Sequence, residues 1–222
     1  MQSSIRRLEK SQFFRRFLCR MRSPLIQECL DKLLVSCSRI QIVAYGIGSI
    51  ESYEVPRLQL ALAILLMQEL GVRVAGSIEV FDPILSSVEC AVVAALGCTV
   101  VSVDEGGRRE ATVPTLFYMP HCELVLYDSL LEANWKPAML KRLVVLGNSF
   151  GVYERCANER VGAGSVPLEV QGRHVLGSRR YVREVEMEDT EYFPKENDEE
   201  DFFEAFHDIS WHFFDLQDDA KL

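Results

Sequence analysis

The residues best suited to binding or catalysis follow short apolar runs of the chain. One group is the loop Gly46-Ile47-Gly48-Ser49, and the other candidates are Glu51, Asp82, His121, Asp128 and Asn148. Glycine permits positive φ and a close backbone approach, so amides in such a loop can hold a phosphate or carboxylate group. The residues therefore predict a site for a small anionic ligand or a nucleotide, although they name no reaction and no cofactor.

Five apolar runs predict the strands that would position these residues. They are Ile40–Tyr45, Ile78–Phe81, Thr99–Val103, Leu124–Tyr127 and Leu143–Leu146. Short apolar runs alternating with helical segments are typical of a parallel sheet, and the carboxyl ends of parallel strands meet at one edge. We therefore expect an α/β fold, a Rossmann-like three-layer sandwich with a mostly parallel sheet of about five strands.

Two other segments carry weaker strand patterns. Thr115–Tyr118 lies in a stretch interrupted by Gly106-Gly107, Pro114 and Pro120, which favours a long loop containing a short strand. Ala205–Phe214 alternates aromatic with polar residues, as an added edge strand would.

The glycine loop and Asp82 each have a structural interpretation beside the functional one. Glu51 stands where a dinucleotide fingerprint has its third glycine, so the loop can equally be a tight turn required by geometry. Asp82 follows the second strand, where an acid accepts hydrogen bonds from ribose hydroxyls. Because Pro83 comes next, Asp82 can also cap the following helix.

His121 and Cys122 follow Pro120 in a segment that offers a metal ligand or a proton-exchanging group. A Cys–His nucleophilic pair is conceivable, but adjacent residues seldom face one another. His207 and His212 are five residues apart, a spacing that does not place them on one helical or strand face. We therefore assign no catalytic residue and no metal ligand, and whether the chain is an enzyme stays open.

Composition and charge limit the class of protein. The chain has 222 residues, 48% of them hydrophobic, a net charge of −9 and seven cysteines with no Cys-x-x-Cys pair. Its longest apolar stretches are broken by charge before the length of about 20 residues that spans a membrane. We expect a globular, intracellular protein with reduced thiols, no membrane insertion and no extended nucleic-acid surface.

The charge is unevenly distributed and predicts the domain organisation. Residues 1–38 read as a basic N-terminal helical extension, and residues 184–201 as an acidic flexible loop. Residues 39–183 and 202–216 would form a single α/β domain. We expect Met1–Arg22 and the acidic loop to be dispensable for folding, the loop more clearly so, because Phe13, Phe14 and Phe17 could pack on the domain.

Several sequence blocks resemble the Sensitivity-to-Red-Light-Reduced (SRR-like) family. They are Tyr45–Ser52, Arg57–Leu62, Phe81–Pro83, Thr115–Cys122, Asn134-Trp135, Leu146–Phe150 and Ala205–Phe214. The resemblance covers roughly Ile40–Phe214. The chain departs from the family pattern at His207 and Asp128, where asparagine is expected.

The resemblance implies a cytoplasmic and nuclear regulatory protein. It links the chain to light signalling, circadian clock-gene regulation and the regulation of haem biosynthesis, with regulatory protein partners and no established reaction. The residues themselves leave an alternative open, a methyltransferase-like enzyme that binds a nucleotide or S-adenosylmethionine in the Gly46–Ser49 crevice.

Overall fold

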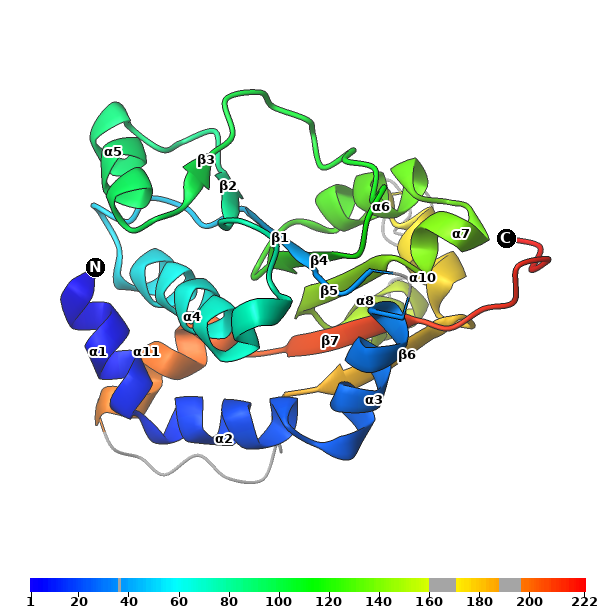
Figure 1. The fold of residues 1–222 in the computed structure, drawn as a ribbon, viewed down its shortest axis with the longest axis horizontal. Helices are drawn as coiled ribbons and strands as arrows, with labels where there is room; N and C mark the ends of the chain where they lie inside the picture. The colour runs from blue at the N-terminus through cyan, green and yellow to red at the C-terminus, as the bar shows by residue number, and fades with distance from the viewer. Residues whose placement is uncertain (36, 160–170, 188–196) are drawn as a thin grey trace.

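The computed structural model describes residues 1–35, 37–159, 171–187 and 197–222, which form a mixed sheet between two layers of helices (Figure 1). Seven strands lie in the order β3-β2-β1-β4-β5-β7-β6 within these residues. Their bounds are β1 (Gln41–Tyr45), β2 (Glu79–Phe81), β3 (Thr99–Val100), β4 (Thr115–Met119), β5 (Leu143–Asn148), β6 (Val182–Glu186) and β7 (Ile209–Phe214). Strands β1 to β5 are parallel, and β7 is antiparallel to β5 and β6. The expected Rossmann-like α/β class is confirmed, with a mixed rather than purely parallel sheet.

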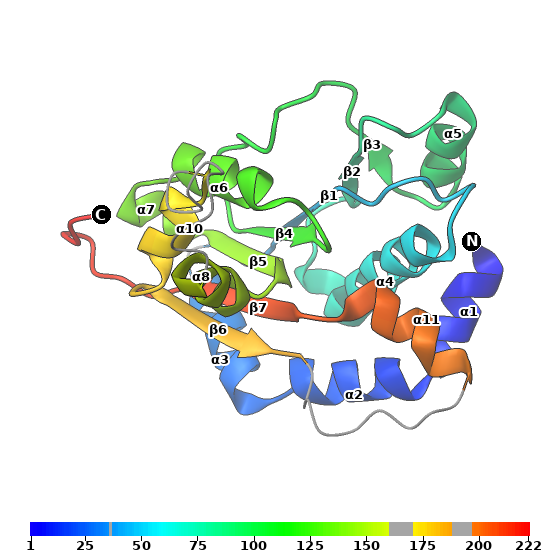
Figure 2. The same ribbon diagram turned by 180° about the vertical axis from the view of Figure 1, so that it is seen from behind.

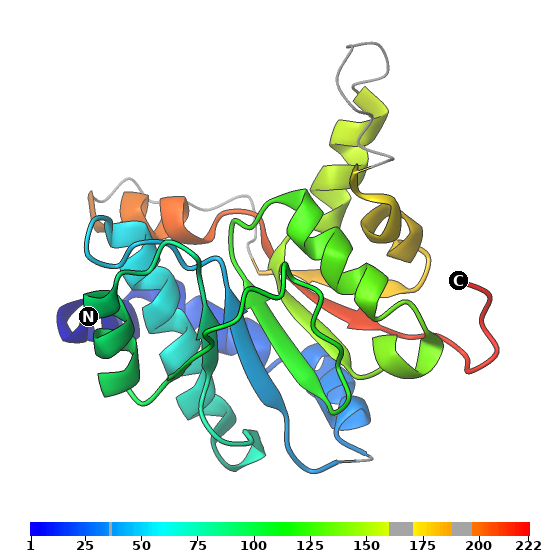
Figure 3. The same ribbon diagram turned by 90° about the horizontal axis from the view of Figure 1, so that it is seen from above.

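Helices cover both faces of the sheet (Figure 2). One face is covered by α1 (Gln2–Lys10), α2 (Gln12–Met21), α3 (Pro24–Leu33), α4 (Glu54–Leu70) and α11 (Asn197–Phe206). The other is covered by α6 (Leu124–Ala133), α7 (Pro137–Leu140), α8 (Phe150–Glu159) and α10 (Arg173–Ser178). A short helix η1 (Gly71–Arg73) follows α4, and α5 (Ser87–Ala95) lies beside β3 at the sheet's end. In Figure 3 the cyan α4 and the green α6 lie on opposite sides of the sheet.

The sequence of β1 shows why two cores form. Ile42 and Ala44 point into the core under α4, whereas Val43 and Tyr45 point into the core under α6. Successive strand residues face opposite sides, so a run that is apolar at every position must be covered on both. The parallel strands hold their carboxyl ends at one edge, where Gly46, Gly48, Asp82 and Asn148 lie.

Helix α4 packs between the sheet and two other helices. Residues Glu54–Arg73 are long and apolar enough to cross a membrane by composition, with a mean hydropathy of 1.3 in the most apolar window. Most of that window, 61%, is buried inside the protein, and α4 contacts α1 and α11. The apolar composition of α4 is therefore explained by its central place in the core.

The prediction of a fourth strand over Leu124–Tyr127 is wrong. Leu124–Tyr127 begins helix α6, and its buried side chains Leu124, Tyr127, Leu130 and Leu131 recur at the three- to four-residue spacing of a helix. The strand that completes the parallel sheet is β4, which corresponds to the weaker Thr115–Tyr118 prediction. All five β4 residues are buried, as expected of a central strand covered on both faces.

The C-terminal part of the sheet also differs from expectation. Strand β7 covers only the second half of Ala205–Phe214, and it lies between β5 and β6 instead of at an edge. The edge strand β6 was not predicted, because Val182-Arg183-Glu184-Val185-Glu186 carries charge on an edge that water reaches. The prediction of an acidic loop is wrong at both of its ends, because Glu184–Glu186 belong to β6 and α11 begins at Asn197. The middle of the predicted loop, residues 188–196, lies outside the described residues.

The N-terminal helices are part of the main core. Leu8, Phe14, Phe17 and Met21 are at most 4% exposed and pack in the core cluster with β1 and α4. This burial argues against the expectation that Met1–Arg22 is dispensable for folding.

Candidate functional site

The glycine loop after β1 needs both of its glycines for structural reasons. Gly46 and Gly48 have φ of +67° and +82°, a region that side chains disfavour. A Cβ on Gly46 would lie 2.5 Å from Sγ of Cys122, and one on Gly48 would lie 3.1 Å from Cγ of Pro56. The loop therefore packs tightly against the β4–α6 connection and the first turn of α4.

Asp82, at the carboxyl end of β2, is bonded to this loop. The amide of Gly48 donates to Oδ2 of Asp82 at 2.8 Å, and the amide of Ile84 donates to Oδ1 at 2.9 Å. One carboxylate thus stabilises its own turn and the glycine loop of the neighbouring strand. The prediction that Gly48 and Asp82 lie at one edge is confirmed, but the Gly48 amide is already used.

Glu89 accepts hydrogen bonds from two further donors at the start of the β1–α4 connection. Its Oε1 accepts from the Ser49 hydroxyl at 2.7 Å and from the Glu51 amide at 2.9 Å, and its Oε2 accepts from the Ser86 amide at 2.7 Å. Ser86 and Glu89 also form the capping box of α5. The hydrogen bonds from the Glu51 and Ser86 amides and the Ser49 hydroxyl lower the pKa of Glu89 to about 2, so this carboxylate is charged at neutral pH. The Glu51 residue itself is exposed.

A small pocket of about 60 Å³ lies further along the same edge. It is lined by His121, Asn148, Ser149, Val152, Tyr153, His207 and Asp208. Nδ1 of His121 lies 3.3 Å from Nε2 of Gln59, and its Nε2 lies 3.4 Å from the carbonyl oxygen of His207. The two histidine rings are 4.3 Å apart between centroids. Burial and the nearby His207 lower the pKa of His121, which favours its neutral form.

Backbone strain is concentrated at this pocket. Among the described residues other than glycine, only His121 and Asp208 have positive φ, at 54° and 58°. Such conformations persist only where neighbouring groups hold them, and they cluster at functional sites. Here the amide of His121 donates to Oδ1 of Asn148 at 2.8 Å, and the carbonyl of Asp208 accepts from the Ser149 amide at 2.7 Å.

Asn148, at the end of β5, connects the turn after β4 to helix α8. Its Nδ2 donates to the hydroxyl of Tyr153 at 2.9 Å, and its own amide donates to the hydroxyl of Tyr127 at 2.9 Å. The Tyr127 hydroxyl in turn donates to the carbonyl of Met119. The structure therefore brings His121 and Asn148 together, as predicted, and adds Tyr153, His207 and Asp208, which sequence reasoning missed as site residues.

Cys122 is not positioned as a nucleophile. Burial raises the pKa of its thiol to about 12, and Sγ donates to the carbonyl of Tyr45 at 3.4 Å. A protonated, buried thiol is unreactive. In the described part of the chain no group of three or more His, Cys, Asp or Glu residues could hold a metal ion.

Asp128 does not lie at the strand ends. It is in α6, where Oδ1 accepts from the amides of His174 and Val175 at 2.6 and 3.0 Å and Oδ2 lies 3.0 Å from Nδ1 of His174. Its placement at the common sheet edge was wrong because Leu124–Tyr127 is helical. The carboxylate instead holds the amino-terminal end of α10 against α6.

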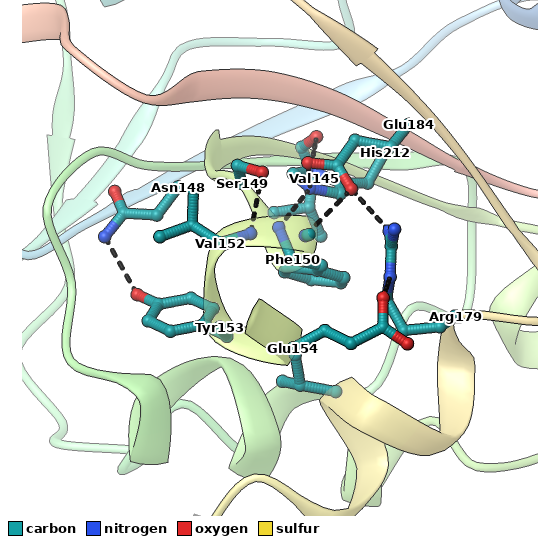
Figure 4. Close-up of polar contacts among 12 residues, drawn as sticks. Val145, Asn148, Ser149, Phe150, Val152, Tyr153, Glu154, Arg179, Glu184 and His212 are labelled. Carbon is teal, nitrogen blue, oxygen red and sulfur yellow. Dashed lines mark hydrogen bonds and ion pairs between the residues drawn. The ribbon is translucent and has the colours of Figure 1, made fainter. Parts of the chain in front are cut away.

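A second cluster was missed although the sequence carries a signal for it. Gly147-Asn148-Ser149-Phe150-Gly151 has the G-x-S-x-G spacing of a hydrolase nucleophile turn, lies between a strand and a helix, and precedes Glu184 and His212 in triad order. His212 is fully buried on β7. It does not line the pocket that contains His207. Figure 4 shows how this cluster is connected.

The geometry of the cluster is that of a helix cap. In a catalytic triad, one imidazole nitrogen bonds to the serine and the other to the acid. Here Nδ1 of His212 lies 3.2 Å from the carbonyl oxygen of Val145, and its Nε2 lies 3.4 Å from the amide nitrogen of Phe150 and 3.5 Å from Oε1 of Glu184. The Ser149 hydroxyl accepts from the Val152 amide at 3.2 Å. The cluster therefore ties the start of α8 to the sheet.

Fold and site together define a Rossmann-like α/β protein in which the carboxylates of Asp82 and Glu89 accept hydrogen bonds from the glycine loop and from the Glu51 amide. A family model, the SRR1 domain, matches residues 26–213. The chain belongs to this family, which confirms the resemblance found in the sequence.

Three relatives show how far the similarity extends. The protein SENSITIVITY TO RED LIGHT REDUCED 1 of Arabidopsis thaliana is 44% identical over 222 residues, which are 100% of this chain and 76% of the relative. An SRR1-like protein of Mus musculus is 40% identical over 127 residues, 56% of this chain and 51% of the relative. An SRR1-like protein of Drosophila melanogaster is 39% identical over 70 residues, 32% of this chain and 25% of the relative.

One solved structure is similar over almost the whole chain. The plantazolicin methyltransferase BpumL, determined in complex with SAH, matches 97% of this chain and 99% of its own, with a TM-score of 0.35 and 9% sequence identity. At this level the similarity carries no inference about activity.

Proposed function

We propose that this protein is a regulatory member of the SRR1 family that acts through protein partners in the cytoplasm and nucleus, without catalysing a reaction. Its role by family resemblance is in light and circadian signalling, including clock-gene expression, and in the regulation of haem biosynthesis. The name of the 44% identical Arabidopsis relative, which refers to red-light sensitivity, supports the signalling part of this proposal.

One observation carries the non-catalytic part. Three donors that could hold a ligand's anion, the Gly48 amide, the Ser49 hydroxyl and the Glu51 amide, are bonded to Asp82 and Glu89 of the protein itself. A ligand anion would have to displace carboxylates that already accept hydrogen bonds, and the pocket beside His121 has a volume of only about 60 Å³. Typical small-molecule sites measure about 300–1,000 Å³.

The test is complementation in Arabidopsis plants that lack the relative. The wild-type chain should restore sensitivity to red light, and Asp82→Asn and His121→Ala should restore it equally, provided that immunoblots show equal protein levels. Asn can still accept the Gly48 amide, so the loop should keep its shape. Failure of both variants at equal protein level would show that the crevice has a chemical role.

A second candidate function is a nucleotide- or S-adenosylmethionine-binding enzyme that uses the same crevice. One observation favours this candidate. Strand β1 lies between β2 and β4, so the strand order reverses beside it, and open α/β sheets bind ligands at such a topological switch point. Gly46, Gly48 and Asp82 lie at this point. Calorimetric titration of the full chain with S-adenosylmethionine, NAD and ATP distinguishes the two. Saturable binding that Asp82→Asn weakens would favour the enzyme, and its absence would favour the partner-binding protein.

A further inference from the structure

A larger cavity lies at the opposite edge of the sheet, at the amino ends of the parallel strands. Its volume is about 290 Å³, close to the lower limit of about 300 Å³ for small-molecule sites. Helix α3 forms one wall, and the start of β5, the end of β7 and the segment that follows β7 form the others. None of its lining residues lines the pocket beside His121, so this cavity is separate from the candidate site.

The floor of the cavity is apolar. It consists of Leu33, Leu143, Val144, Phe213 and Leu216, each at most 9% exposed. These side chains come from both cores. An apolar body placed on this floor would remove its remaining surface from water.

Three cationic side chains line the rim of the cavity. They are Lys32, Lys141 and Arg183, and the lining also includes the acid Asp215. Cationic side chains beside an apolar surface hold an anion close to the floor when it takes the place of their acid partners.

The ion pairs at the rim can give way to a ligand. Lys32 pairs with Glu28 at 2.8 Å and Lys141 with Asp218 at 2.5 Å, and the two acids are 58% and 89% exposed. Arg183 lies 3.9 Å from Asp215, too far for a strong hydrogen bond, and 40% of its side chain is exposed. Exposed pairs of this kind contribute little to stability, so a ligand anion can replace the acids without loss of folding.

We propose that this cavity binds a small amphipathic anion, with an apolar body on the Leu33–Leu216 floor and one carboxylate or phosphate group held by Arg183, Lys32 and Lys141. The floor alone does not select a charge, and the rim alone does not hold a fully hydrated ion. Both parts are needed for a defined site. This site is independent of the function proposed above.

Calorimetric titration of the full chain with five probes tests the proposal. Octanoate and octyl phosphate carry both parts of the ligand, 1-octanol lacks the charge, and acetate and inorganic phosphate lack the apolar body. Octanoate or octyl phosphate should bind saturably at one site, and the tighter of the two identifies the preferred head group. No saturable binding of either, or binding of 1-octanol as tightly as either, would overturn the proposal.

Matched variants locate the binding. Arg183→Gln should weaken octanoate or octyl phosphate roughly fivefold, as expected for the loss of one half-exposed charged contact. Arg108→Gln makes the same charge change at an exposed pair with Glu132, away from the cavity, and should bind like the wild type. Lys141→Gln gives a second test if Arg183→Gln lowers the melting temperature. Unchanged binding in both cavity variants would contradict the assignment.

Thiol modification gives an independent readout. Cys29 lines the cavity and is 9% exposed, whereas Cys19 on α2 is exposed outside it. Saturating octanoate or octyl phosphate should slow the reaction of Cys29 with N-ethylmaleimide, followed by peptide mass spectrometry, and leave Cys19 unchanged. Equal rates at Cys29 with and without ligand would place the ligand elsewhere and overturn the proposal.

Discussion

Glu184→Gln is a substitution whose effect on stability can be calculated from the structure. Oε2 of Glu184 accepts from Nη1 of Arg179 at 2.5 Å and from the Gly151 amide at 3.1 Å, and Oε1 lies 3.5 Å from Nε2 of His212. Only 11% of the side chain is exposed. The charge thus lies between a guanidinium, an imidazole and the amino-terminal end of α8, where a helix favours an anion.

The pKa of Glu184 gives the size of the effect. Burial raises this pKa, but the neighbouring His212, Ser149 and Arg179 side chains outweigh burial and lower it from 4.5 to about 2. At about 1.4 kcal/mol per pH unit, this gap corresponds to about 3 kcal/mol of stability at pH 7. Breaking a buried pair from one side costs about as much. Glu184→Gln should therefore lower the melting temperature by about 6–12 °C.

Urea unfolding between pH 7 and pH 3 tests this value. Because folding lowers the pKa, the stabilisation is complete above 4.5 and disappears as the pH falls towards 2, so wild type and Glu184→Gln should converge in acid. Glu154→Gln is the control, since Glu154 pairs with Nε of the same Arg179 at 3.0 Å but is 46% exposed. It should cost less than about 1 kcal/mol. Equal costs for the two variants, or a difference that does not change with pH, would refute the reasoning.

One deletion and two other substitutions follow from the packing and the hydrogen bonds. Deleting residues 1–22 should abolish the cooperative thermal transition seen by circular dichroism, because five of their apolar side chains belong to the main core. Gly147→Ala should cost about 1–3 kcal/mol in urea unfolding, since its Cβ would lie 2.6 Å from the Tyr127 hydroxyl, whereas Gly151→Ala, with no contact under 3.4 Å, serves as control. Glu89→Gln should cost about 2 kcal/mol at pH 7, and the cost should shrink as the pH falls from 4.5 towards 2.

The pattern of short apolar runs correctly predicted those strands whose position depends on the local sequence alone. Strands β1, β2 and β5 lie within or close to their predicted runs, because each is a short apolar segment between polar ends. Leu124–Tyr127 misled because four apolar residues fit either a buried strand or the first turn of a helix. Only the next turn, with Leu130 and Leu131 buried on the same side, decides between them.

The candidate site also contains one part that the local sequence predicts and one part that it does not. Glu89 was predictable, since Ser86 three residues before it makes a capping box that can be read from the sequence. The pocket at His121 was not, because His207 and Asp208 reach it through the pairing of β7 with β5, which are about sixty residues apart in the chain. No local pattern reveals such a pairing.

Asp82 narrows the chemistry that the glycine loop can recognise. An anion placed on the Gly48 amide would either displace the Asp82 carboxylate, 2.8 Å away, or lie beside it as a like charge. A ligand hydroxyl meets no such barrier, because it can donate to the carboxylate without removing it from the amide. If a small molecule binds this loop, Asp82 therefore favours one that presents hydroxyl groups, such as a ribose, over one that presents a phosphate. A nucleoside and its phosphorylated nucleotide should then bind with similar affinity. A strong preference for the nucleotide would require the Asp82 carboxylate to release the Gly48 amide.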